Sequence, residues 1–520
     1  MSGPVPPGAS YLELIFQGVD MASDTYITWE SVVCPPDFRR VNGAKVDALK
    51  EEFDRALPGT GAESAGQDAT LLAAPRVTAN RLSEADRAAI QERLGRCLVD
   101  FRENVGFMCE LVEVLDLGGF TKAVQRESAR AREGERVLVI LNPPPKLGQI
   151  PWEMLPLDVE GARAFLKDHE GRDDFFDTER PRVLLDIADV VTMAPLLRRD
   201  ADPSIPHPAW TPGAGMYLVE PWDTGRGDRA VLQRADQAAW RERVNGLGNQ
   251  AVAPPREHGH LADRIWLSEA LRANAGDAGA AETTAAPITR MLYIGHIKGT
   301  GEESALLLND RADVYGLGEV DHNGFRWLSA MDLTKGTTTW REKKYDRINQ
   351  ERASRDGRRY PNGERLPGGL RPTADENGEE TVPAVEGWDL WPMPPRVGLI
   401  ACHSGSEAAS AEPFGLAAGC LEAGAELVFA TRWTMYTDRA FEALDPSERP
   451  HPFNELAIEV DKFLQSETPI EDMSEWKRRK LENWRRDPTD VANAPITWAG
   501  LTVYRAPDRA VKEDAEPVGP

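Results

Sequence analysis

Short apolar runs alternate along the chain with stretches in which apolar residues recur every three or four positions. The runs are rich in β-branched residues and stop at turn-forming residues, as RVLVILN does before Pro143 and Pro144, which is typical of buried strands. We predict strands at 136–142, 182–191, 215–221, 290–296, 396–402 and 426–433. The helical spacing predicts helices at 81–117, 228–246, 262–274 and 452–465. Strands that are apolar on both faces and alternate with helices favour an α/β fold, with a mostly parallel sheet covered by helices on each side.

Composition narrows the class of protein. The chain has 520 residues, 41% hydrophobic and 28% charged, which suits several globular domains. No apolar run approaches the ~18 residues of a membrane-spanning helix, and a net charge of -24 repels phosphate backbones, so we expect neither a membrane nor a nucleic acid as partner. The five cysteines are widely spread and form no Cys-x-x-Cys pair, so we expect no disulfide framework and a cytoplasmic location.

Four segments fall outside the alternating pattern. Residues 1–24 lack a secretory signal, and their YLELIFQG stretch resembles a viral 3C-type cleavage site, so we treat them as a flexible leader, native or added. Residues 25–84 form an N-terminal region of unknown role. The stretch 334–395, rich in Arg, Glu, Gly and Pro, predicts a mobile surface insertion that could be cleaved. Residues 506–520 predict a disordered tail.

A cysteine and a histidine end two of the predicted strands. RVGLIAC ends at Cys402 and RMLYIGH ends at His296. Because parallel strands present their carboxyl ends at one edge of a sheet, the thiol and the imidazole could meet there. An imidazole promotes ionisation of a thiol and can later protonate a leaving amine. The pair therefore predicts a cysteine protease, with Cys402 as nucleophile and His296 as general acid and base.

Such a site also needs N–H donors for the oxyanion that forms on the attacked carbonyl. The backbone amides of Gly295, Ile297 and Cys402 are the candidates. His403 is a poor base for its neighbour, because successive side chains of an extended segment point to opposite faces. The His258-Gly-His260 pair has no nearby Cys, Asp or Glu cluster that would complete a zinc site. Asp310, Asp313 and Asp321 lack the spacing and the central Gly of a calcium-binding loop, so no metal is predicted.

An ordered series of motifs resembles the CHAT family of caspase-like cysteine peptidases, in the same broad clan as separase and caspases. The similarity spans roughly residues 85–505. IGH ending at His296 and LIACHSG around Cys402 are similar to the family's catalytic segments. The remaining motifs are IPWEML (150–155), MYLVEP (216–221), SALLLND (304–310), WLSAMDL (327–333), FGLAAGCLEAGAELVFATRW (414–433) with Asp438, and APITWAGLTVY (494–504).

The resemblance implies a three-layer α/β/α sandwich with a caspase-like sheet, divided into an N-terminal part at 85–225, which could be a degenerate caspase-like half, and a catalytic part at 226–505. It implies no metal or organic cofactor. Clan relatives that cleave after Arg or Lys use an acidic pocket, for which Glu302, Glu303, Glu407 and Asp438 are candidates here. Trp152 and Glu153 are best interpreted as structural, and Cys420 as core packing. Ile297 departs from the family, which often has Gly after the histidine.

The leading hypothesis is a regulated CHAT-type endopeptidase that cleaves a particular protein substrate. By analogy, the target could be a bacterial gasdermin in antiviral defence, and a sensor or regulator protein would activate the enzyme. Two rivals remain open. One is a catalytically silent caspase-like scaffold for protein assembly, docking through residues 25–80, and the other is a cysteine acyltransferase or another thiol hydrolase.

Overall fold

The computed structural model describes most of the chain. The described residues are 10–21, 23–57, 97–170, 180–194, 210–221, 231–254, 262–274, 287–299, 303–310, 316–318, 320, 324–338, 370, 373–374, 380–381, 383–402, 414–433, 435–438, 441 and 451–506.

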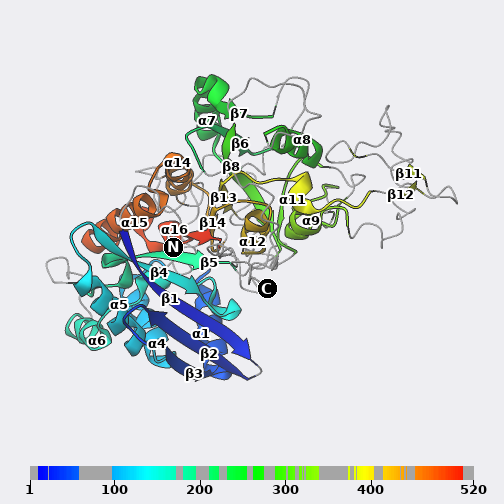
Figure 1. The fold of residues 1–520 in the computed structure, drawn as a ribbon. Helices are drawn as coiled ribbons and strands as arrows, with labels where there is room; N and C mark the ends of the chain where they lie inside the picture. The colour runs from blue at the N-terminus through cyan, green and yellow to red at the C-terminus, as the bar shows by residue number, and fades with distance from the viewer. Residues whose placement is uncertain are drawn as a thin grey trace, which may run out of the picture.

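A single mixed sheet of 13 described strands forms the centre of the molecule (Figure 1). The strands are β1 Ser10–Met21, β2 Asp24–Ser31, β3 Asp37–Asn42, β4 Glu135–Asn142, β5 Ala188–Met193, β6 Ala214–Val219, β7 Ala251–Val252, β8 Ile288–Lys298, β9 Ala305–Leu306, β10 Leu328–Ser329, β13 Arg396–Cys402, β14 Leu427–Thr431 and β15 Leu501–Arg505. The order is β10-β9-β8-β13-β14-β15-β5-β4-β1-β2-β3, with β6 beside β8 and β7 beside β6. A separate pair, β11 Thr373–Ala374 and β12 Glu380–Thr381, stands outside this sheet.

Most pairings in this sheet are parallel, including β6 with β8, β8 with β13, β13 with β14 and β4 with β5. The antiparallel pairs lie mainly toward the two ends, where β1, β2 and β3 form a meander and β9 folds back on β8. The expected α/β fold with a mostly parallel sheet is confirmed.

Helices cover both faces of the sheet. They are α1 Gly43–Ala56, α4 Phe101–Val114, α5 Gly118–Arg130, α6 Val159–Asp168, α7 Arg234–Gly246, α8 Arg264–Asn274, α9 Ala330–Lys335, α11 Gly387–Leu390, α12 Phe414–Glu422, α14 Pro452–Gln465, α15 Pro469–Arg486 and α16 Pro495–Trp498. None of the described helices is long and apolar enough to cross a membrane.

Two hydrophobic cores follow from the alternation of side chains along the strands. On β8, Leu292 and Ile294 belong to the core that contains α14 and α15, whereas Met291 and Tyr293 belong to the core that contains α8, α9 and α12. Figure 1 shows these two groups of helices on opposite sides of β8 and β13. Both faces of the central strands are buried, which explains why their sequences are continuous apolar runs.

Two predicted elements have wrong boundaries. The helix predicted at 81–117 begins, in its described part, at Phe101, because the Asp100 side chain caps α4 by accepting hydrogen bonds from the Arg102 and Glu103 amides. That helix ends at Val114. The strand predicted at 182–191 starts later, at Ala188, after a 3₁₀ turn at Leu184–Asp186.

The prediction of a flexible leader at 1–24 is wrong for Ser10–Met21. This segment is β1, which pairs in parallel with β4 from Ser10 to Gln17 and antiparallel with β2. Leu14 and Phe16 are fully buried. In the predicted N-terminal region 25–84, the described residues 25–57 extend the same sheet and its core through β2, β3 and α1. Residues 58–84 lie outside the described residues.

The mobile insertion predicted at 334–395 is wrong at its C-terminal end. Residues 383–395 are described, and within them Leu390, Trp391 and Met393 are buried in the core beside α8. The Trp391 indole donates to the Arg264 carbonyl at 3.1 Å. Most of the remaining insertion, and the tail from residue 507 onward, lie outside the described residues.

Candidate functional site

The fold brings the two candidate catalytic positions together at one edge of the sheet. Strands β8 and β13 are parallel neighbours, and in their register Cys402 is the direct partner of His296. This pair ends the ladder, although β8 itself continues to Lys298. Neighbouring strands lie ~4.8 Å apart, which is close enough for side chains at these two positions to touch. The described part of Cys402 is its backbone.

Positions 296 and 402 also share one face of the sheet, because in-register partners of adjacent strands lie on the same side. On β8 this is the face of Leu292 and Ile294, and on β13 it is the face of Gly398 and Ile400, which is covered by α14. Gly398 permits this close packing, since a Cβ there would lie 2.9 Å from Val460 Cγ1.

His296 lies in a tightly held part of the backbone. Its carbonyl accepts hydrogen bonds from the Leu307 amide at 3.0 Å and from the Tyr293 hydroxyl at 2.7 Å. The residue is only 3% exposed. A substrate could therefore reach the imidazole only after a covering group moves.

The oxyanion candidates lie in or beside the same ladder. Gly295 is paired with Ala401 and Cys402 with His296, while Ile297 is paired on its other side with Leu306 of β9. Amides inside a ladder are directed at neighbouring strands. An oxyanion hole built from them would need the end of the β8–β13 ladder to open, so this assignment stays a prediction.

Two of the four acidic pocket candidates, Glu303 and Asp438, lie within the described residues. Glu302 and Glu407 lie outside the described residues, and Glu303 is exposed. Asp438 is 1% exposed, and its carboxylate accepts from the Phe453 amide at 2.8 Å and the Asn454 amide at 3.2 Å. Asp438 thus satisfies the amino end of α14, which gives it a structural role.

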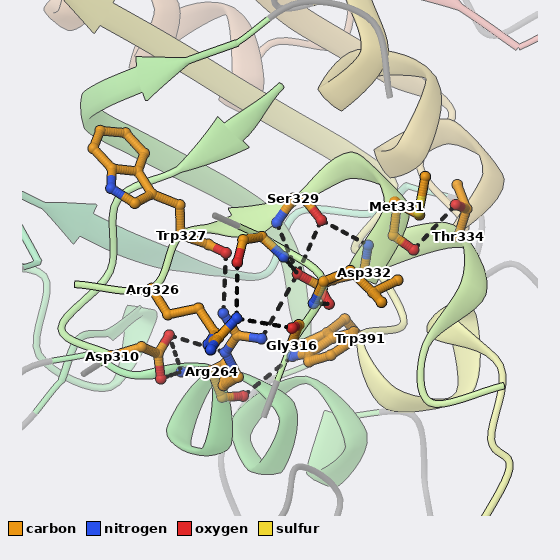
Figure 2. Close-up of polar contacts among 12 residues, drawn as sticks. Arg264, Asp310, Gly316, Arg326, Trp327, Ser329, Met331, Asp332, Thr334 and Trp391 are labelled. Carbon is orange, nitrogen blue, oxygen red and sulfur yellow. Dashed lines mark hydrogen bonds and ion pairs between the residues drawn. The ribbon is translucent and has the colours of Figure 1, made fainter. Parts of the chain in front are cut away.

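A buried arginine organises the segments that follow His296 (Figure 2). Arg264, at the start of α8, is fully buried, and its Nε lies 3.2 Å from Asp310 while its Nη1 lies 3.6 Å from Asp332. Its Nη2 donates to the Trp327 carbonyl at 3.1 Å. Burial raises the pKa of Asp310 to about 6 in spite of the opposing charge of Arg264.

The sequence pattern assigns no metal to Asp310 and does not predict a role for Arg264. A local signal existed: SALLLND ends an apolar run with Asp310, and WLSAMDL carries Asp332 between Met331 and Leu333. A buried aspartate needs a cationic or hydrogen-bonding partner. Gly316 is part of the same arrangement, since a Cβ there would fall 1.8 Å from Arg264 Nη1. The cluster holds the segments around Asp310 and Asp332 against α8.

A second buried ion cluster ties the N-terminal part to the strand next to β13. Glu153, in the 3₁₀ turn Trp152–Met154, lies 2.7 Å from Arg432 Nη1 and also bonds Lys477 of α15. All three residues are at most 3% exposed. Burial opposes ionisation of Glu153, but Arg432 and Lys477 together hold its pKa below the ordinary value. The structural interpretation of Glu153 is confirmed, as is that of Trp152, which is buried in the core.

Among the described residues, one group could offer three ligands to a metal ion. The ligand atoms of Asp236, Asp438 and His451 lie within 4.8 Å of one another. His451 Nδ1 lies 3.1 Å from Asp236, and the Asn454 side chain donates to the same carboxylate at 3.0 Å. These mutual hydrogen bonds, together with the cap on α14, account for the group without an ion.

Comparisons with known proteins leave the family open. No protein-family model matches the chain, and no match was found among curated proteins. The geometry of the site therefore carries the functional argument.

Proposed function

We propose that this protein is a cysteine endopeptidase that uses Cys402 and His296 as a catalytic dyad. The observation that supports the proposal most is the register of β8 and β13, which makes these two residues partners at the carboxyl edge of a parallel sheet. Ligands and substrates of open α/β sheets bind at this edge.

The chemistry follows from the two side chains. His296 takes the proton of the Cys402 thiol, and the thiolate attacks the carbonyl carbon of the scissile peptide bond. When the tetrahedral intermediate collapses, the C–N bond breaks and the imidazolium gives its proton to the departing amine. Water, with His296 as base, then hydrolyses the thioester, which releases the second product and restores the thiol.

The proposal includes the caspase-like arrangement and the CHAT-type class suggested by the motifs. The parallel β6, β8, β13 and β14 with helices on both faces are compatible with such a sheet. We further propose a specific protein as substrate and an activating regulator, since the 3% exposure of His296 requires a conformational step before cleavage. By analogy with the CHAT family, the first candidate substrate to test is a gasdermin-type protein of a bacterial defence system.

The test is cleavage of a proteome-derived peptide library and of candidate partner proteins by the full chain, compared with Cys402→Ala and His296→Gln. We expect new peptide ends in the native sample that are absent from both variants. Identical cleavage by native protein and variants would contradict the dyad. Folding of each variant is checked by its thermal transition.

The burial of His296 favours one alternative, a caspase-like scaffold without catalysis. This alternative predicts that Cys402 reacts with electrophiles no faster than an ordinary thiol, even under conditions in which a partner binds. The two hypotheses therefore differ in the ionisation of a single sulfur atom.

A further inference from the structure

Tyr293 is a fully buried residue of β8 whose hydroxyl turns back onto the backbone of the proposed catalytic histidine. Because residues of a strand alternate between faces, positions 293 and 296 lie on opposite sides of the sheet. Tyr293 belongs to the core containing α8, α9 and α12, away from the face that positions 296 and 402 share.

The contacts of its hydroxyl are specific. The oxygen lies 2.7 Å from the His296 carbonyl and 3.0 Å from the Leu307 carbonyl. The Leu307 amide donates to the same His296 carbonyl at 3.0 Å, just beyond the β8–β9 pair of Ile297 and Leu306. The hydroxyl therefore links β8 to Leu307, the residue after β9, at the point where the ladder to β13 ends.

Packing alone does not require this hydroxyl. A phenylalanine would fill the same apolar surroundings, whereas a buried tyrosine hydroxyl has to find a polar partner. Here the shorter of its two contacts is to the carbonyl of His296. With the hydroxyl in place, two donors fix that carbonyl.

We propose that Tyr293 is a positioning residue that holds the backbone of His296 so that the imidazole stays aligned with Cys402. The inference rests on the proposed dyad. Misplacing a catalytic group by ~1 Å can cost ~10²-fold in rate. Loss of the Tyr293 hydroxyl should therefore lower kcat by roughly 10- to 100-fold with little change in KM, and should weaken the ionisation of the thiol.

The thiol provides a test that needs no substrate. Iodoacetamide alkylation of the full chain is followed at Cys402 by peptide mass spectrometry from pH 5 to 9, for the native protein, Tyr293→Phe and Tyr217→Phe. Tyr217 of β6 is the matched control, because it is also buried, but its hydroxyl bonds Asp461 Oδ1 of α14 at 3.0 Å instead of the backbone of His296. We expect the apparent pKa of Cys402 to rise in Tyr293→Phe and to stay unchanged in Tyr217→Phe.

The titration of Cys402 separates failure of the dyad from failure of the role proposed for Tyr293. If the native thiol titrates like a free cysteine, near ~8.5, the proposed dyad itself fails. If it titrates lower, and Tyr293→Phe titrates at the same low value, the dyad stands and the role of Tyr293 is refuted. If Tyr293→Phe does not fold, 4-fluorophenylalanine at position 293 fills the space without donating and should show the raised value, while 4-aminophenylalanine, which still donates, should restore the native profile. An unchanged profile with the fluorinated residue overturns the proposal.

Discussion

Replacing Glu153 by Gln should destabilise the protein far more than the loss of an ordinary ion pair. The substitution keeps the shape of the side chain but removes the negative charge that faces Arg432 and Lys477, which are 2% and 3% exposed. Arg432 retains hydrogen bonds to Ala499 and Thr502, and Lys477 retains one to Leu501, so neither cation loses every partner. Removing one partner of a buried ion pair costs ~3–5 kcal/mol, and we expect a loss in this range.

The assay is urea unfolding followed by tryptophan fluorescence at pH 7, with Glu113→Gln as the control. Glu113 pairs with Arg163 at 2.9 Å, but the two side chains are 49% and 44% exposed, so its loss should cost only ~0–1 kcal/mol. The triple replacement of Glu153, Arg432 and Lys477 by Met should recover much of the stability, because buried ion groups exchanged for apolar residues are often neutral. A loss below ~1 kcal/mol in Glu153→Gln would refute the reasoning, since the penalty for an uncompensated buried charge would be missing.

Two further predictions concern the helix that covers the proposed site. Gly398→Ala should destabilise the protein by ~1–3 kcal/mol, because the new Cβ would lie 2.9 Å from Val460 Cγ1 and 3.0 Å from Leu292 Cδ1. Gly246→Ala is the control and should not destabilise it, because a Cβ there meets nothing within 4 Å. Equal thermal transition temperatures for the two variants would contradict this prediction. Burial raises the pKa of Asp438 to about 7, above its value of ~3.9 in the unfolded chain. Between these two pH values the folded state holds a proton that the unfolded chain has released. The free energy of unfolding should therefore fall as the pH rises from ~4 through about 7. That decline should flatten in Asp438→Asn, measured by thermal unfolding at several pH values. An equally steep decline in the variant would contradict the assignment to Asp438.

The central strands could be predicted from the sequence because each is buried on both faces. Apolar runs such as RVGLIAC leave little choice of structure, and β13 matches its prediction. The start of the chain was harder to interpret. YLELIFQG resembles a protease cleavage site, which favours a leader, but its buried Leu14 and Phe16 alternate with exposed Glu13 and Gln17 as in a strand, and the pairing with β4 decides for the strand.

The candidate pair could be predicted from two strand ends, but its register could not. A shift of one residue between β8 and β13 would have placed Cys402 and His296 on opposite faces, and no local pattern excludes that shift. The buried ion pair of Arg264 and Asp332 could not be predicted from the sequence either, since the two residues are 68 positions apart and meet only because α8 and α9 pack on the same face of the sheet. Helix α15 was not predicted, because Lys477 and Lys480 interrupt its apolar stripe and are buried through ion pairs with Glu153 and Glu455.

The most direct test of the account is the ionisation of the Cys402 thiol with and without the imidazole of His296. Site-resolved alkylation rates of the native full chain are compared with those of His296→Gln between pH 5 and 9, with Cys420, which is fully buried and whose pKa burial raises to about 12, as the unreactive internal control. We predict an apparent pKa for Cys402 well below the ~8.5 of a free thiol in the native protein and a return toward that value in the variant. Identical profiles in the two proteins would contradict the claim that the end of β8 activates the end of β13.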